Sequence, residues 1–301
     1  MGPLRWPKRK PPAPPPVSLQ TVQDSVFGGN VNGLRNVRQD SSRRWAAAGA
    51  LAGLAGALLL FAPASWLARA LASATGEHLL IVDTRGSIWR GSGVLVLTGG
   101  AGSRDAAALP GRLHWRMALK GLGLQLAARQ ECCTNGELLL GLQPGLGRLA
   151  ITVDNRTDWL VRLPAGVLSG LGTPWNTLQL GGSLRLSARE LRLESAQGRW
   201  RQSGALDLDL LNLSSRVSTV APLGSYRFSV AADPASPGLS TLRLSTLEGA
   251  LQLSGAGTLN PGGKSRFTGE ASAAPGREEA LNNLLNIIGR RQGSRSVLTI
   301  G

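Results

Sequence analysis

Hydrophobic and polar residues alternate with a period of two over most of the chain beyond residue 73. Leu113, Trp115, Met117 and Leu119 share one parity in "RLHWRMAL", and similar alternation recurs in "GRLAITV", "GSLRLSA", "ALDLDL" and "TLRLST". A period of two places successive side chains on opposite faces of a strand. The sequence therefore predicts a mainly β body over residues 73–301, an antiparallel, twisted sheet with one or two short helices.

The parity of the leucines changes twice within this body. In "SLRLSARELRLES" the leucines move from even to odd positions. A turn or bulge is therefore predicted near Arg189 and Glu190, because only an irregularity there keeps one face apolar. In "ALDLDLLNL" the parity changes again, between Leu210 and Leu211.

Three stretches share a plan of glycine, a short strand and a Ser-Gly break: "TRGSIWRGSG", "GRWRQSG" and "GALQLSG". We predict hairpin corners, where glycine tolerates a positive φ and the tryptophans pack inward. The alternative for Trp89 is an exposed aromatic at a docking surface. The predicted structural corner residues are Gly86, Trp89, Gly93, Gly198, Trp200 and Gly204.

Two segments depart from the β pattern. "DWLVRLPAGVLSGLG", residues 158–172, has an Asp cap and the apolar spacing of a short helix interrupted by Pro164. "GREEALNNLLNIIG" repeats apolar residues at i, i+3, i+4 and i+7 and ends at Gly289, which predicts an amphipathic helix. Its apolar positions are Leu281, Leu284, Leu285 and Ile288.

An apolar segment precedes the body. "WAAAGALAGLAGALLLFAPASWLA", residues 45–68, runs 24 residues without a charge. As a helix it would measure about 36 Å, so we predict a transmembrane helix. Arg43 and Arg44 precede it, and the positive-inside rule then places residues 1–44 in the cytoplasm and the body in the periplasm. The alternative is a cleaved signal peptide, because "ALA" at residues 70–72 has the form that a signal peptidase reads.

The charge of the chain changes the picture little. The formal net charge is +15, but eight basic residues fall in residues 1–44 and the remainder are spread without a basic stripe. We therefore predict no nucleic-acid binding. "PKRKPPAPPPVS" within residues 1–44 is basic, Pro-rich and without periodicity, which predicts a disordered tail.

The chain offers few residues for catalysis. His78 and His114 are its two histidines and have no HExxH spacing, so neither a metal site nor a cofactor is predicted. Asp207 and Asp209 alternate with leucines, which indicates a solvated strand face rather than a catalytic carboxylate pair. We predict no catalytic residues and no enzyme activity.

Cys132 and Cys133 are the only cysteines and are adjacent in the sequence. They cannot form a CxxC motif. In an oxidising compartment they leave three alternatives: a vicinal disulfide, an intermolecular bridge, or two reduced side chains.

The order of several motifs resembles one known family. "DTRGSIWRGSG" opens the body, "LPGRLHWRMAL" and "CC" follow, and "APLGSYRFSV", "LSTLEGALQLSGAGTL", "RFTGEASAAPG" and "LNNLLNIIGRR" end it. This series resembles the N protein of type II (general) secretion systems over roughly residues 45–300. The Pro-rich tail departs from the usually short start of that family.

The resemblance implies an inner-membrane accessory component of the Gram-negative machine that exports folded periplasmic proteins across the outer membrane. Expected partners are other inner-membrane components of the system, with the outer-membrane secretin as a further candidate. The family is not known to be enzymatic, so no active-site residue is carried over. The alternative is an AsmA-like, membrane-anchored β-groove protein that handles lipids. An open, leucine-lined groove would favour that alternative, and a face closed by the helix over 281–288 would favour a structural role.

Overall fold

The computed structural model describes residues 31–301 except residues 197–198, 237 and 261–263, with side chains from residue 43 onward. Contacts divide the chain into two units, residues 1–59 and residues 60–301. The second unit holds the whole sheet.

The N-terminal unit contributes one long helix, α2 (Val31–Leu60), and a second helix, α3 (Ala64–Ala74), begins after Pro63. A proline disfavours the helical conformation in the residue before it, and Pro63 is itself extended. The prediction of one continuous helix over residues 45–68 is therefore wrong. Among the described residues, no helix combines the length and the hydropathy that a membrane crossing requires.

The structure adds detail at two predicted boundaries. Residues 31–44 belong to α2, and the first 30 residues of the predicted disordered tail lie outside the described residues. The body also begins before residue 73, because Ala64 of α3 packs with Ile81 and Trp115.

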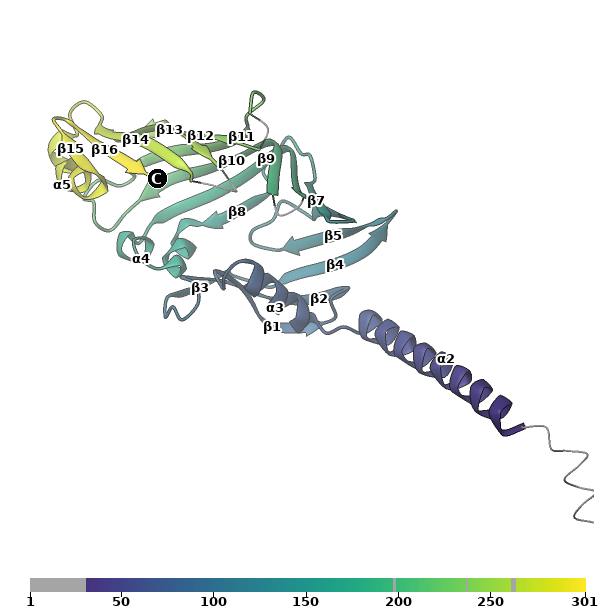
Figure 1. Ribbon diagram of the computed structural model, residues 1–301. Helices are drawn as coiled ribbons and strands as arrows, with labels where there is room; N and C mark the ends of the chain where they lie inside the picture. Colours follow the sequence, from purple (N-terminus) through teal and green to yellow (C-terminus); the bar gives the residue numbers. More distant parts are fainter. Residues whose placement is uncertain (1–30, 197–198, 237, 261–263) are drawn as a thin grey trace, which may run out of the picture. The chain divides into compact units, whose positions relative to one another are not determined.

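The sheet is mainly antiparallel and holds 16 strands, as the alternating pattern predicted (Figure 1). Its hydrogen-bonded order is β1-β2-β4-β5-β6-β7-β9-β10-β11-β12-β13-β14-β16-β15, with β3 paired to β2 and β8 to β9. The first half comprises β1 (Leu79–Gly86), β2 (Arg90–Thr98), β3 (Ala106–Ala108), β4 (Leu113–Lys120), β5 (Gly123–Gln130), β6 (Leu138–Gly145), β7 (Arg148–Val153) and β8 (Val161–Pro164). The second half comprises β9 (Gly181–Ala196), β10 (Arg199–Ser214), β11 (Gly224–Ala232), β12 (Ser240–Gly249), β13 (Leu251–Leu259), β14 (Arg266–Ala273), β15 (Arg290–Gln292) and β16 (Arg295–Ile300).

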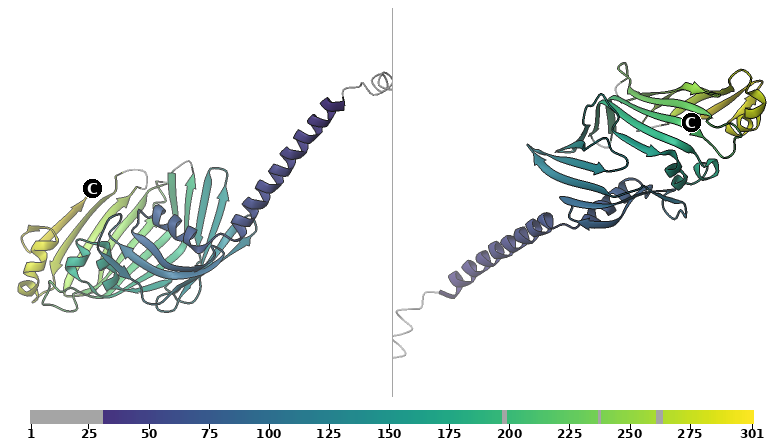
Figure 2. Two further views of the ribbon diagram at one scale, coloured as in Figure 1. Left: turned by 90° about the horizontal axis from the view of Figure 1, so that it is seen from below. Right: turned by 180° about the vertical axis from the view of Figure 1, so that it is seen from behind.

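Short helices cover parts of the sheet (Figure 2). The 3-10 helix η1 (Ala165–Leu171) contacts the paired strands β2 and β3 and also β9, which is far from them in the strand order. Helix α4 (Trp175–Leu178) follows η1. Pro164 interrupts the segment 158–172 as predicted, but the residues before it form β8 rather than a helix. The predicted amphipathic helix is confirmed as α5 (Glu278–Ile288), with Gly289 at its C-cap.

Both predicted parity changes are confirmed as irregularities. The β9–β10 register shifts between Ser203 and Ala205, opposite the segment that contains Glu190, whose φ is +49°. The second shift follows Leu210, where Asn212 has a φ of +51°. Each bulge inserts an unpaired residue, so the leucines on both sides of it keep to one face.

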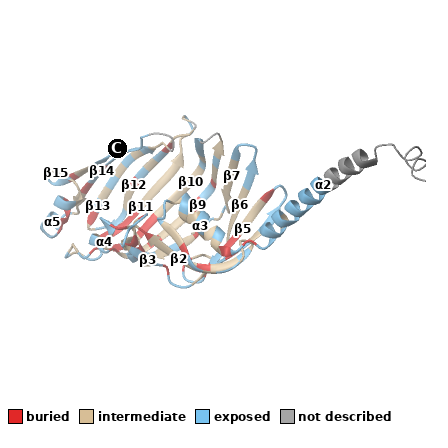
Figure 3. Ribbon diagram, turned by 60° about the horizontal axis from the view of Figure 1, so that its bottom comes forward, coloured by how far each residue is buried: buried red, intermediate tan, exposed pale blue. Residues whose placement is uncertain are grey.

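The core consists of three clusters of buried side chains (Figure 3). The largest lies under α5 and includes Tyr226, Leu281 and Leu285. A second joins α3 to β1 and β4 through Trp115, and a third forms around Leu160.

The stretch "TRGSIWRGSG" forms a hairpin rather than one strand between corners, because β1 ends at Gly86 and β2 begins at Arg90. Trp89 is half-buried in the bend. The buried tryptophan is Trp115, whose Nε1 donates to the Ile88 carbonyl at 3.2 Å. The inward packing expected of Trp89 is thus found at Trp115, on the neighbouring strand β4.

The predicted glycine corners have separate physical causes. Gly86 has a φ of +87°, whereas a Cβ on Gly93 would come within 2.3 Å of the Ile81 Cγ2 atom. Gly204 has a φ of +78° inside a bulge of β10, not at a hairpin corner. Trp200 is 41% exposed, so its expected inward packing is wrong. Gly198 lies outside the described residues.

Candidate functional site: an apolar pocket in the sheet

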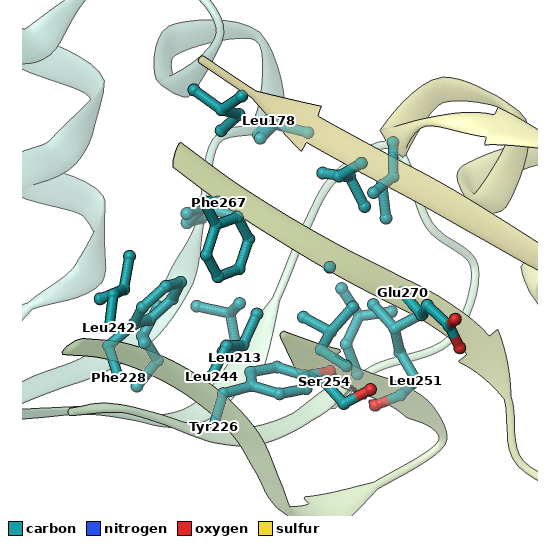
Figure 4. Close-up of a pocket in the computed structure, with 18 of the residues that line it drawn as sticks. Leu178, Leu213, Tyr226, Phe228, Leu242, Leu244, Leu251, Ser254, Phe267 and Glu270 are labelled. Atoms are coloured by element: carbon teal, nitrogen blue, oxygen red, sulfur yellow. Dashed lines mark hydrogen bonds between the residues drawn. The ribbon is translucent and has the colours of Figure 1, made fainter. Parts of the chain in front are cut away.

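Leucine and aromatic side chains from β10 to β14 project from one face of the sheet and surround a pocket of about 530 Å³ (Figure 4). The alternation of these strands produces this arrangement, because every second residue lies on the apolar face. Residues that line the pocket include Leu178, Leu213, Tyr226, Phe228, Leu242, Leu244, Leu251 and Phe267.

The strand registers explain why the pocket is hollow. Phe228 pairs with Leu208 on one side and Leu244 on the other, so a row of large side chains crosses β10, β11 and β12. The same row continues through Gly255 on β13 and Gly269 on β14. Two glycines in succession remove the side chains that would otherwise fill the row.

Phe267 occupies part of the space above these glycines. A Cβ on Gly255 would lie 2.4 Å from the Phe267 Cζ atom, and a Cβ on Gly269 would lie 3.0 Å from its Cε1 atom. The ring also faces Phe228 at a centroid distance of 6.4 Å. The glycines therefore admit an aromatic ring that larger residues would displace.

Helix α5 covers only one side of the pocket. Leu284 and Ile288 of α5 line it, and α5 contacts β14 and β16, while Leu178 of α4 lines it from another segment. Leu281 and Leu285 of α5 are fully buried in the core cluster. The apolar face is thus closed in part by this helix, and a hollow remains between the helix and β10 to β13.

Two polar side chains at the pocket, Tyr226 and Ser215, are hydrogen-bonded to the protein backbone. The Tyr226 hydroxyl donates to the Leu251 carbonyl at 3.0 Å, and burial raises the pKa of this phenol above its usual range. The Ser215 hydroxyl donates to the Leu178 carbonyl at 2.6 Å. Leucine and aromatic side chains make up most of the lining, and Ser254, Arg266 and Glu270 add polar groups to it.

The residues that alternate with these apolar side chains lie on the opposite face of the sheet, and several of them are charged. Asp209 is 2% exposed and accepts hydrogen bonds from Arg185 Nη2 at 2.7 Å and from Arg227 Nε at 2.6 Å. The Arg227 guanidinium, with help from Arg185, holds the pKa of this carboxyl below its usual range despite the burial. Asp207 pairs with Arg189 at 3.0 Å.

The prediction of a solvated face for the two aspartates is therefore wrong. Long arginine side chains from the adjacent strands cover the carboxylates, and strand alternation by itself does not reveal this cover. Arg185 of β9 and Arg227 of β11 thus form a structural clamp on Asp209 of β10, and Arg189 of β9 adds an ion pair to Asp207.

In the structure, Cys132 and Cys133 are joined in a disulfide within the turn between β5 and β6. Cys133 is buried, and its carbonyl accepts a hydrogen bond from the Arg162 amide at 2.7 Å. Thr134 forms an isolated bridge with Val161. The cysteine turn is thus tied to β8.

The remaining candidate residues are not brought together. His78 Nδ1 lies 2.9 Å from the Thr75 carbonyl, and His114 is exposed on β4. Within the described part of the chain, no group of three metal-ligating side chains occurs. The sequence pattern of single strands does not predict the pocket, because its two signals, Gly255 and Gly269, align only through strand pairing.

Comparison with known proteins agrees with this architecture. Residues 77–298 match the family described as type II secretion system (T2SS), protein N. The match covers nearly all of the sheet. No curated protein and no solved structure matches the chain.

Proposed function

Because the chain belongs to the type II secretion system protein N family, we propose that it is an inner-membrane accessory component of that system. It supports the export of folded periplasmic proteins across the outer membrane through protein–protein contacts. The observation that carries this proposal is the family match over residues 77–298, which spans the sheet from β1 to β16.

The apolar part of residues 45–68 serves as the membrane anchor in this proposal. Supporting it, large apolar side chains of α2 are exposed, among them Trp45 at 79% and Leu51 at 67%. Arg43 and Arg44 precede them, which favours a cytoplasmic N-terminus and a periplasmic body.

The body contributes a scaffold rather than catalysis. Its partners are other inner-membrane components of the system and, as a further candidate, the outer-membrane secretin. The arginine-clamped carboxylates and the tied cysteine turn support this interpretation, because both stabilise the sheet and neither presents reactive groups in a cleft.

Deletion of the gene tests the proposal. We expect proteins that the system normally secretes to accumulate in the periplasm, and the full chain supplied in trans should restore their release. A resident periplasmic protein that the system does not export is the control and should keep its distribution. Normal secretion in the deletion strain would contradict the proposal.

The apolar pocket favours a second candidate function, the binding of a single acyl chain. A peptide would bring backbone N–H and C=O groups into a mostly apolar lining that leaves most of them without partners, whereas an alkyl chain carries no such groups. The volume of about 530 Å³ lies within the range of small-molecule sites. This candidate corresponds to the AsmA-like, lipid-handling alternative.

Mass spectrometry tests this second function. The full chain is purified in detergent and incubated with a long-chain fatty acid, and the fraction of protein that carries the fatty acid is measured. We expect Leu244→Trp, which places a large ring in the pocket, to lower the bound fraction at least tenfold. Leu247→Trp is the matched control, because Leu247 lies on the same strand and is 46% exposed. Equal occupancy in both variants, or no binding by the unsubstituted chain, would contradict acyl-chain binding.

A further inference from the structure

Three hairpin turns of the first half of the sheet lie at one end of their strands. The β1–β2 bend reaches β4, where the Met117 amide donates to the Trp89 carbonyl at 2.7 Å. The β4–β5 turn follows directly along β4, and Leu124 of β5 pairs with Leu142 of β6. The β6–β7 turn therefore lies at the same end, and Arg148 after it pairs with Ala196 at the end of β9.

These turns carry leucine side chains that are exposed and lie outside the hydrophobic core. Leu122 and Leu146 are fully exposed at the tips of the β4–β5 and β6–β7 turns, and Leu119 is 77% exposed. Each tip places its leucine between two glycines, so no neighbouring side chain shields it. Single exposed leucines are common, but fully exposed leucines on two turns at one end of a sheet indicate an interaction surface.

The charge of this end is basic. Lys120 and Arg148 adjoin the exposed leucines, and Arg199 and Arg201 begin β10 beside them. Glu194 is the only acidic residue of segments 116–124, 143–150 and 194–203, and it is bound by Arg192. Acidic side chains gather instead at the other end of the strands: Glu131, Glu137, Asp154, Glu248, Glu278 and Glu279.

The chain also enters the body at this end. The Ala62 carbonyl accepts a hydrogen bond from the Ile88 amide at 3.0 Å, and Pro63 forms a bridge with Ser87 in the β1–β2 bend. Phe61, directly before this contact, is 81% exposed. The point at which the chain enters the second unit therefore lies at the same end of the sheet as the exposed leucines.

We propose that this turn edge, defined by Leu119, Lys120, Leu122, Leu146 and Arg148, rests on the anionic surface of the membrane. Leucines enter the boundary between headgroups and acyl chains, while the lysine and arginine side chains face lipid phosphates. The inference rests on the proposed attachment of the chain to the inner membrane, and it adds a second contact that orients the sheet toward that surface.

Environment-sensitive labels on the full chain test the proposal. Leu122→Cys and Leu146→Cys are each labelled with the fluorophore NBD, and the protein is reconstituted into vesicles of phosphatidylcholine and phosphatidylglycerol at about 3:1. Leu247→Cys, at the acidic end, is the matched control. Unsubstituted protein measures any labelling of the native cysteines. We expect blue-shifted emission and quenching by brominated lipid at positions 122 and 146 but not at 247.

The charges are tested in the same protein. The double variant Lys120→Glu, Arg148→Glu should lose most of the blue shift of the label at position 122. In the labelled protein without these two changes, high salt should reduce the blue shift, because salt screens the attraction to anionic lipid. If the protein floats with the vesicles while the labels at positions 122 and 146 stay as water-exposed as the label at position 247, the contact of the turn edge with the membrane is contradicted, but the proposed membrane anchor is not. That result would favour a protein partner for the leucines. Failure of the whole protein to float would overturn both.

Discussion

Asp209 keeps its charge at a nearly inaccessible position because Arg185 and Arg227 reach it from the two neighbouring strands. The arginines themselves are partly exposed, so most of the desolvation falls on the carboxylate. A buried carboxylate is stable in this setting only while both guanidinium groups donate to it.

Replacement of Asp209 by Asn should lower the free energy of unfolding by about 2 kcal/mol at pH 7, because charge-assisted hydrogen bonds are lost. The pKa of Asp209 is lower in the folded state than in the unfolded state, where it is about 3.9. The stabilising contribution is therefore fully present at pH values above the unfolded-state pKa. It is lost as the pH falls through the folded-state pKa. Urea unfolding at pH 7 and at successively lower pH measures the difference. Asp83→Asn, at an exposed carboxylate, is the control and should change stability far less. A pH-independent difference between Asp209→Asn and the parent would refute the clamp.

Trp115, rather than Trp89, should carry the packing energy of the first hairpin. Trp115 is 4% exposed and anchors the β1–β2 bend through its indole N–H. Trp115→Ala should cost about 3 to 5 kcal/mol, as large aromatic truncations in cores do. Trp89→Ala should cost less, because that side chain is only half-buried. Thermal unfolding of the two variants side by side decides the order, and an equal or larger loss for Trp89→Ala would reverse this assignment.

At the scale of elements, the long strands β9 and β10 depend on local breaks in their regularity. Glu190 and Gly204 both adopt positive φ where the register shifts, and the shift returns the leucines to the apolar face. Helix α5 depends on the same face, because Leu281, Leu284 and Leu285 are buried against the core.

Gly204→Ala tests the bulge of β10. A Cβ there would lie 2.3 Å from the Glu190 carbonyl oxygen, and the φ of +78° is already unfavourable for alanine. We expect a loss of about 2 to 3 kcal/mol from strain and displacement. Gly111→Ala, with a φ of +77° and nothing within 4 Å, carries the conformational strain alone and should cost about 1 kcal/mol. Equal losses measured by denaturant unfolding would show that the close approach is unimportant.

At the scale of the whole molecule, a helical N-terminal segment precedes a single continuous sheet whose apolar face is partly covered by α5, α4 and η1. The uncovered portion forms the apolar pocket, and the polar parity of the same strands forms the arginine clamp. One sheet thus presents two chemically different faces.

The proposed topology predicts the behaviour of a fusion. A reporter that is active only in the periplasm, joined after Gly301, should be active, and alkaline carbonate should leave the full chain in the membrane fraction. The same fusion lacking residues 45–60 is the control and should be inactive, because the apolar segment is then absent. Activity confined to a cytoplasmic reporter would contradict the topology.

Alternation of leucine and polar residues by itself determined that the body is an antiparallel sheet, and i, i+3, i+4 spacing determined α5. These patterns are local, because each strand or helix must turn its own apolar residues to one side. Tertiary structure alone decided that Trp115 rather than Trp89 is buried, and that arginines on neighbouring strands cover Asp209. It also decided the pocket, because Gly255 and Gly269 become neighbours only through strand pairing. The register between strands that are distant in the sequence is set by the packing of the whole sheet. The residue pattern of a single strand therefore does not determine it.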